Sequence, residues 1–195
     1  MMVPTGQVFS HMLGVFATDD AAMLGLLSSA PHYWWAISRA STMKGDLRYT
    51  PTDVFETFAR PELTEELRRL GGRLDSFRRE LMLARQAGLT ATYNLVHGPQ
   101  CTDADIAELR AIHVAMDREV LRAYGWEGID PDHGFHETRQ GIRYTVGPVA
   151  RQEILDRLLE LNHERYAAEV AAGLHEKKKP AAARRKAAQE GLFDG

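Results

Sequence analysis

The stretch 130–137 contains the densest group of metal-ligating residue types in the sequence. His133 and His136 have a spacing that lets two imidazoles bind one metal ion when both stand on the same face of a helix. Pro131 and Gly134 interrupt the stretch and favour a loop instead. We therefore interpret the group as a hydrogen-bonded loop cluster rather than a metal site.

Three further groups have residue types used in catalysis but lack the neighbouring residues that catalysis requires. Cys101 lies just after Gly98-Pro99 without an orienting group, so we expect an inert surface thiol. Glu176-Lys177-Lys178 has the Glu-x-Lys order of metal-dependent nucleases, yet it lies in a basic tail. The sequence has no Pro-Pro pair, and its one Gly-Gly pair falls within a helical pattern, so neither a flipped-base clamp nor a glycine-rich cofactor loop is expected. The sequence predicts no catalytic centre and no cofactor on this chain.

The segment 39–48 has a different character, because it concentrates donors for phosphates and for the edges of bases. These donors are Arg39, Ser41, Thr42, Lys44 and Arg48. An ordinary polar loop would have the same composition, and the residues alone do not separate the two interpretations. The neighbouring pair Trp34-Trp35 has rings that can stack on bases, but adjacent tryptophans more often belong to a core, which we expect here.

Charge is unevenly distributed along the chain. The net charge is −3, but residues 176–195 hold six Lys and Arg against three Asp and Glu, a balance of +3 that leaves −6 for the rest. Such a tail either contacts nucleic acid or only aids solubility. The single cysteine, with no signal-like N-terminus and no long apolar run, leads us to expect a cytoplasmic protein without a membrane segment.

The elements that must position the donors begin with a mixed segment, 1–61. An apolar, β-prone stretch covers 8–16, and Asp19 or Asp20 can cap a short helix after it. The aromatic run 32–37 fits a buried strand or a short helix, and periodicity does not decide between them.

Two prolines, Pro51 and Pro61, bracket a short element that follows the donor-rich loop. We expect Tyr49, Phe55 and Phe58 to form the core that supports this loop.

From residue 62 onward the pattern is that of long helices. Apolar residues spaced alternately by four and three predict a helix over 62–87 that packs antiparallel along another helix. The residues of this seam are Leu63, Leu67, Leu70, Leu74, Phe77, Leu81 and Ala84. Similar patterns predict helices over 103–124 and 149–172. The apolar face of the last one consists of Leu155, Leu158, Leu159, Asn162, Tyr166 and Val170.

Shorter elements connect these helices. We expect a short helix over 89–97, a loop over 127–141 and a short strand over 143–146. Beyond 174 the composition is too poor in apolar residues to fold alone, which predicts a disordered basic tail over 175–195.

The segment STMKGDLRYTPTDVFETFARP, residues 41–61, resembles the end of the target-recognition domain of type IIG and type IIL restriction-modification enzymes, the MmeI-like group. The family pattern there is Ser-Thr, a basic or glycyl turn, Arg-Tyr-(Ser/Thr)-Pro-(Ser/Thr)-Asp and Phe-Glu-Thr-Phe-Pro. One departure is Ala59, which stands where the family usually has proline. Four later segments resemble the helical C-terminal part of the same enzymes: 89–97, 109–126, 134–146 and 157–174.

In that family one polypeptide normally joins an N6-adenine DNA methyltransferase to its recognition domain, and this chain resembles only the last part. The resemblance thus implies a DNA-recognition and scaffold portion without its own catalytic centre. Its partners would be double-stranded DNA and a partner methyltransferase or missing upstream domain, which would bind the S-adenosylmethionine. The alternatives are a structural module that docks on the methyltransferase without contacting DNA, and a gene fragment without function.

The fold class expected from these elements is α+β, predominantly helical. Residues 1–61 would be a small α/β remnant of the recognition domain. Residues 62–174 would form a long-helix hairpin or bundle that acts as a scaffold, followed by the basic tail.

The end of the tail generates a first prediction. Gln189, Leu192 and Phe193 match the short Gln-x-x-Leu-Phe peptide with which bacterial proteins bind the replication sliding clamp, although a chance ending would match as well. On the clamp interpretation, immobilised clamp retains the full chain, and changing Leu192 and Phe193 together to alanine abolishes retention. A pull-down in which the parent chain is not retained removes the clamp from its partners.

Overall fold

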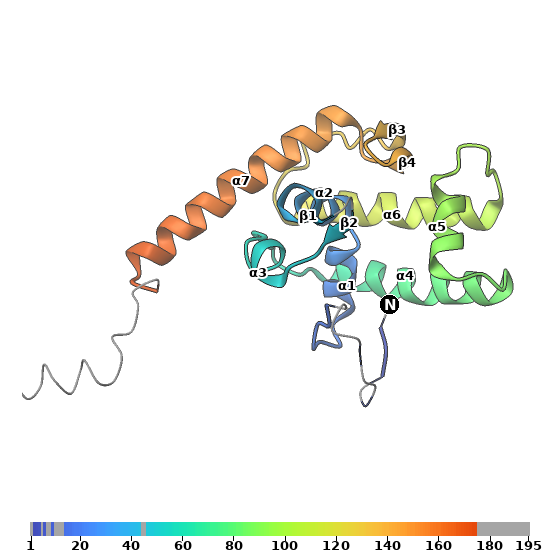
Figure 1. The fold of residues 1–195 in the computed structure, drawn as a ribbon, viewed down its shortest axis with the longest axis horizontal. Coiled ribbons are helices and arrows are strands. Elements are labelled where there is room, and N and C mark those ends of the chain that lie inside the picture. Colours follow the sequence, from blue (N-terminus) through green and yellow to red (C-terminus); the bar gives the residue numbers. More distant parts are fainter. Residues whose placement is uncertain (1, 5, 7–8, 10–13, 44–45, 175–195) are drawn as a thin grey trace, which may run out of the picture.

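The computed structural model describes residues 2–4, 6, 9, 14–43 and 46–174, and for the strands on either side of position 44 it describes the backbone alone. This part of the chain is α+β and predominantly helical, as predicted (Figure 1). The elements are α1 (Ala21–Leu27), α2 (Ala30–Arg39), β1 (Ser41–Met43), β2 (Asp46–Arg48), α3 (Pro51–Val54), α4 (Glu65–Ala84), α5 (Leu89–His97), α6 (Ala104–Ala123), β3 (Gly134–Thr138), β4 (Gly141–Thr145) and α7 (Pro148–Ala171). The predicted tail lies outside the described residues.

The aromatic run 32–37 belongs to helix α2, which decides between the two structures that periodicity left open. Pro31 stands in the first turn of this helix, where its missing N–H leaves no helical hydrogen bond unmade. Trp34 and Trp35 are 6% and 1% exposed, so both are core residues, as expected. The indole Nε1 of Trp35 donates to the backbone oxygen of Val54 at 3.2 Å and thereby ties α2 to α3.

Helices α4 and α6 pack antiparallel, which confirms the role predicted for the seam. At one end the Arg85 Nε donates to the Asp105 carboxylate at 2.8 Å, and at the other end the Thr64 hydroxyl donates to the Glu119 carboxylate. The buried seam residues between these ends are Leu67, Leu70, Leu74 and Leu81. Leu63 and Phe77 are partly buried against the same core, whereas Ala84 is exposed.

Helix α1 packs closely against α4 at a glycine. A Cβ built on Gly71 would lie 1.9 Å from the backbone oxygen of Ala21, a distance that no side chain can occupy. Asp20 caps α1, accepting from the N–H of Ala22 at 2.9 Å, as predicted for this aspartate. Glycine lowers the stability of a helix interior, but the close approach of α1 requires it at position 71.

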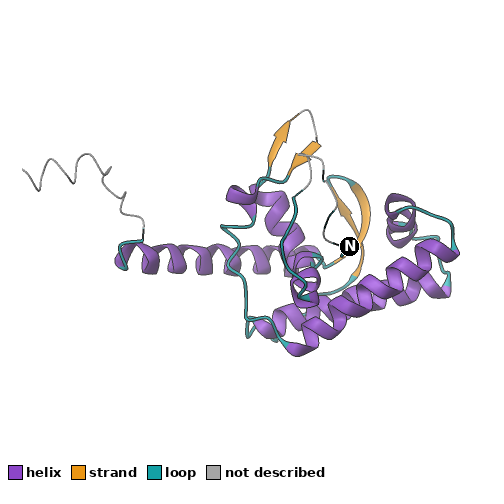
Figure 2. Ribbon diagram, turned by 90° about the horizontal axis from the view of Figure 1, so that it is seen from below, coloured by secondary structure: helices purple, strands orange, loops and turns teal. Residues whose placement is uncertain are grey.

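Two segments expected to be loops contain β-hairpins. The donor-rich segment after α2 is the antiparallel pair β1–β2, which projects from the helical body (Figure 2). The second hairpin, β3–β4, includes residues 134–138 of the loop predicted over 127–141, so that prediction was wrong for β3. The β-prone stretch predicted over 8–16 lies mostly outside the described residues, and 14–16 are neither strand nor helix.

The first half of α7 packs on the body with part of its predicted face, since Leu158 is buried and Leu155 is partly buried. Ala150, Ile154 and Leu158 are buried against α2 and the core. Further along, Asn162 and Arg165 donate to the backbone oxygens of Thr57 and Arg60 at 2.7 and 2.8 Å. The C-terminal end of α7 extends away from the other described elements (Figure 1), and Leu159 and Val170, predicted to line a packed face, are 37% and 49% exposed. The helix itself begins and ends within a residue of the predicted bounds.

One hydrophobic core runs across residue 61, the boundary predicted between a recognition remnant and a scaffold. Leu26 and Trp35 from the first segment share this core with Leu74, Ile112 and Leu158 from the second. The division into two domains and a tail stays a prediction, but the two segments pack as neighbours.

The α4–α6 packing generates a prediction about stability. Leu74 is fully buried, so Leu74→Ala should lower the free energy of unfolding by about 2–5 kcal/mol. Leu83→Ala is the matched control on the same helix, since Leu83 is 73% exposed and its truncation should change stability little. Equal melting temperatures for Leu74→Ala and the parent would contradict the packing described above.

Candidate nucleic-acid interface

Arg39, the first predicted DNA-contacting residue, stands at the C-terminal end of α2 and is exposed. Its guanidinium carbon lies 4.4 Å from the centroid of the Trp35 ring. Because Trp35 is held in the core, this cation–π contact fixes the guanidinium at the base of the projecting hairpin. No carboxylate in the described part of the chain lies within 4.0 Å of it, so its donors can bind an external acceptor.

Three of the other predicted donors belong to the strands of the hairpin that follows. The strand register places Ser41 opposite Arg48 and Thr42 opposite Leu47. Ser41, Thr42 and Arg48 are thereby brought together on one two-stranded element, although their side chains lie outside the described part. Lys44 lies outside the described residues altogether. The predicted contact loop is therefore a hairpin, and its DNA contacts stay a prediction.

The residues expected to support this segment do pack beneath it. Phe58 is 3% exposed, and its ring meets that of His32 with centroids 5.1 Å apart. Tyr49 is half-buried and its hydroxyl bonds His32 Nε2 at 3.1 Å. Phe55 is half-buried and packs on Phe16, with centroids 4.8 Å apart.

A buried carboxylate anchors the other end of α2. Asp117 on α6 is 4% exposed and accepts from the N–H of Ala30, the first residue of α2, at 2.7 Å. Its second oxygen bonds Nε2 of His133 at 2.8 Å. Ser29, the residue before α2, provides no side-chain cap, so Asp117 replaces it from a distant helix. The position of α2 therefore depends on α6.

Two further arginines lie beside this region and were not predicted as binding residues from the sequence. Arg60 lies over the ring of Phe55, 4.6 Å from its centroid, and Arg151 in the first turn of α7 lies 4.6 Å from that of Trp34. Arg60 falls within the segment that carries the family resemblance, which was the one available signal. Nothing in the sequence relates Arg151 to Trp34, because their contact is made by the packing of α7 on α2.

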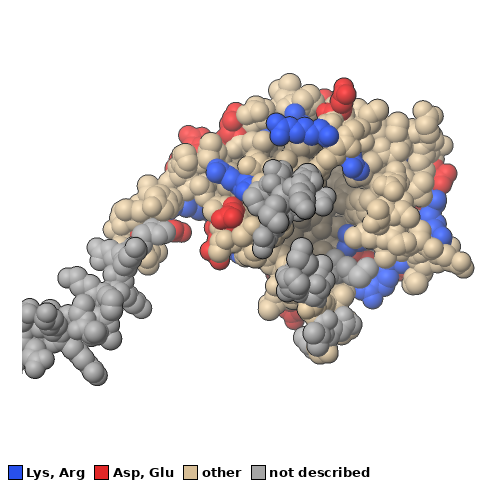
Figure 3. All heavy atoms as spheres, viewed as in Figure 1, with Lys and Arg blue, Asp and Glu red and all other residues tan. Residues whose placement is uncertain are grey.

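The arginines of the molecule differ in whether a carboxylate neutralises them. On α4 and at its C-cap, six of them face carboxylates: Arg68, Arg69, Arg73, Arg78, Arg79 and Arg85. Around α2 and α3, by contrast, the guanidinium groups of Arg39, Arg60 and Arg151 have no described carboxylate within 4.0 Å. Figure 3 shows the face of the molecule from which the hairpin projects, on which both Arg side chains and Asp or Glu side chains are exposed.

The stretch 130–137 proves to be hydrogen-bonded, but it is not a loop throughout. His133 bonds Asp117, whereas His136 lies on β3 and its Nε2 bonds the backbone oxygen of Asp132 at 2.8 Å. The two imidazoles thus serve separate contacts. Among the described residues no group of three or more His, Cys, Asp or Glu is arranged to hold a metal ion. Cys101 is a free, half-buried thiol.

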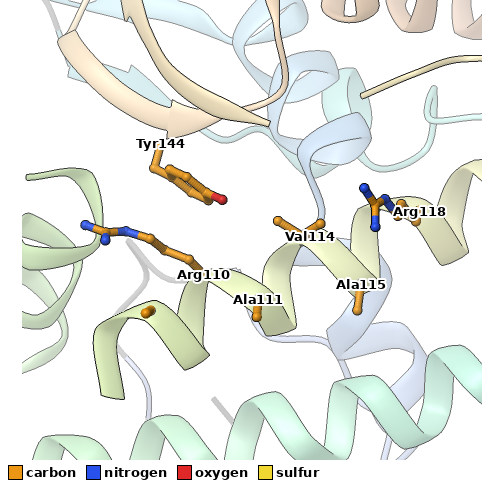
Figure 4. Close-up of a pocket in the computed structure, with 7 residues that line it drawn as sticks. Arg110, Ala111, Val114, Ala115, Arg118 and Tyr144 are labelled. Carbon is orange, nitrogen blue, oxygen red and sulfur yellow. The ribbon is translucent and has the colours of Figure 1, made fainter. Parts of the chain in front are cut away.

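A shallow hollow of about 500 Å³ lies along α6 (Figure 4). It is lined by Ala107, Arg110, Ala111, Val114, Ala115, Arg118 and Tyr144. Arg110 has a structural role here, because its guanidinium donates to four backbone oxygens at and beyond the end of α5, at 2.8–3.0 Å. The lining contains no carboxylate that could act with these groups in acid–base chemistry.

Comparison with protein-family models, with curated proteins and with solved structures found no match to this chain. None of the described helices is both long enough and apolar enough to cross a membrane.

Three histidines beside α2, α5 and α6 are held neutral by the fold. Burial lowers the pKa of His32 to about 4, and its Nδ1 donates to the Leu27 backbone oxygen. Burial also lowers the pKa of His113 to about 4, and its Nε2 bonds the Tyr93 hydroxyl at 2.8 Å. Burial, with nearby Arg143, lowers the pKa of His97 to about 4.

These histidines predict a specific dependence of stability on pH. Each binds a proton near pH 6.5 when unfolded but only near pH 4 when folded, so the unfolded chain gains protons first as the pH falls. His32 and His113 should each lower the free energy of unfolding by about 2 kcal/mol between pH 7 and pH 5. Chemical unfolding at several pH values measures this loss.

Matched variants test which group is responsible. His113→Gln should flatten the dependence, whereas His163→Gln, at an exposed site on α7, should leave it unchanged. The same slope in His113→Gln and the parent would contradict the burial of this imidazole.

Proposed function

We propose that this chain is a DNA-recognition and scaffold portion of a bacterial restriction-modification system of the N6-adenine DNA methyltransferase type. It would act with a partner methyltransferase that holds the S-adenosylmethionine. The observation that carries the proposal is the projecting hairpin β1–β2, in the segment that resembles a target-recognition domain, with Arg39 held over Trp35 at its base. No catalytic role is proposed for the chain itself.

The way the hairpin is mounted supports a recognition role. A base-reading element has to be held at a defined height and angle, and α2 leads directly into β1. That helix is tied to α6 through Asp117 and to α3 through Trp35. A rigid helical body that carries a short projecting hairpin has the shape needed to present side chains to a groove of DNA.

A second function is favoured by one specific observation. From its middle onward, α7 and the turn after it expose apolar side chains, among them Leu159, Val170 and Leu174. Exposed apolar surface of this kind is typical of protein-binding sites. The chain would then be a structural module that docks on the methyltransferase without contacting DNA.

Binding of the full chain to a random-sequence DNA duplex over a series of salt concentrations separates these functions. Contact with phosphates gives a logarithm of affinity that falls steeply and linearly with the logarithm of salt concentration. We expect this slope for the parent chain. Affinity that is absent, or that does not respond to salt, would favour the docking module.

Variants in the hairpin locate the contact. Lys44→Ala removes a cation that any phosphate accepts, so it should weaken binding to all duplexes and reduce the slope by about one unit. Arg48→Ala removes a bidentate donor and should relax preference at one base pair, at a cost of about 1–3 kcal/mol. Both variants binding every duplex as tightly as the parent, at low and high salt, would place the hairpin outside the interface.

A further inference from the structure

Two arginines outside the hairpin have the properties of phosphate-binding side chains. The guanidinium carbons of Arg60 and Arg151 each lie over an aromatic ring, at 4.6 Å from its centroid. Neither has a described carboxylate within 4.0 Å, and Glu153, near Arg151 on α7, is taken by Arg157 at 2.6 Å. A cation with unused donors and a fixed orientation is the state that favours an external anion.

Both arginines are placed by the same elements that place Arg39. Trp34 and Trp35 are consecutive residues of α2, and they hold Arg151 and Arg39 respectively. Arg60 follows α3, to which Trp35 is hydrogen-bonded through the backbone of Val54. The three guanidinium groups therefore have fixed positions relative to α2, the helix that leads into the hairpin.

Stacking lowers the entropic cost of using these side chains. A free arginine loses rotamer freedom when it binds a phosphate, whereas a guanidinium already held on a ring has lost most of that freedom on folding. Trp34 is buried and Phe55 is half-buried, so both rings are themselves fixed by the core. Lysine at the same positions would keep the charge but not the flat stacking surface.

We propose that Arg60 and Arg151 bind backbone phosphates of duplex DNA beside the hairpin. This inference rests on the proposed function, and it extends the interface from the recognition segment to α7. The helical part of the chain then contributes to DNA contact as well as to bracing.

The salt dependence of binding tests the proposal with the full chain and a random-sequence duplex. Arg60→Ala and Arg151→Ala should each reduce the slope by about one unit, since each removes one phosphate contact. Arg60→Lys and Arg151→Lys should keep the parent slope while binding several-fold more weakly, because the charge remains and the stacking does not. Arg69→Ala is the control, as Arg69 is exposed on α4 and paired with Glu66.

The outcomes separate this inference from the proposed function. A parent chain without salt-dependent binding overturns both. A parent that binds with a steep slope, together with Arg60→Ala and Arg151→Ala variants that keep it, overturns this inference alone. A slope reduced equally by Arg69→Ala also overturns it, because the loss would then follow net charge. Melting temperatures within a few degrees of the parent show that each variant is folded.

Discussion

The carboxylate of Asp117 is the interaction on which the arrangement of the other elements most depends. It is buried on α6. One oxygen accepts from the first N–H of α2, and the other bonds His133, the residue just before β3. A buried carboxylate is tolerated only when both oxygens find donors, and here two segments far apart in the sequence supply them. Removing that side chain would leave the N–H of Ala30 without its acceptor, and α2 is the element that positions the hairpin and Arg39.

The same core holds the helical body together and places the cations around α2. Close approach of α1 to Gly71 on α4, and the antiparallel α4–α6 pair, form a rigid base. The cations of α4 are consumed by neighbouring carboxylates, and those around α2 are directed onto aromatic rings instead.

The sequence predicted those features that depend on local periodicity. Leucines spaced by four and three predicted α4, and Asp20 predicted the start of α1. Both features depend only on residues that are close together in the sequence. The β3 strand was missed because Gly134, His136 and the flanking prolines and aspartates are typical of loops.

Contacts between residues that are far apart in the sequence could not be predicted from the order of residue types. Asp117 meets Ala30, and Arg151 meets Trp34, only after α6 and α7 have packed on α2. The predicted donors other than Arg39 stay predictions, because the structure describes their backbone at most. What it adds is the place of their hairpin on α2.

Hydrogen–deuterium exchange of the full chain, with and without saturating duplex DNA, tests the central claim most directly. DNA held by the hairpin and the flanking arginines predicts slower exchange in two separate regions, residues 39–61 and the first turns of α7, with α4 unchanged. Slower exchange confined to α4 and α5, or no change at a DNA concentration that saturates binding, would contradict the account.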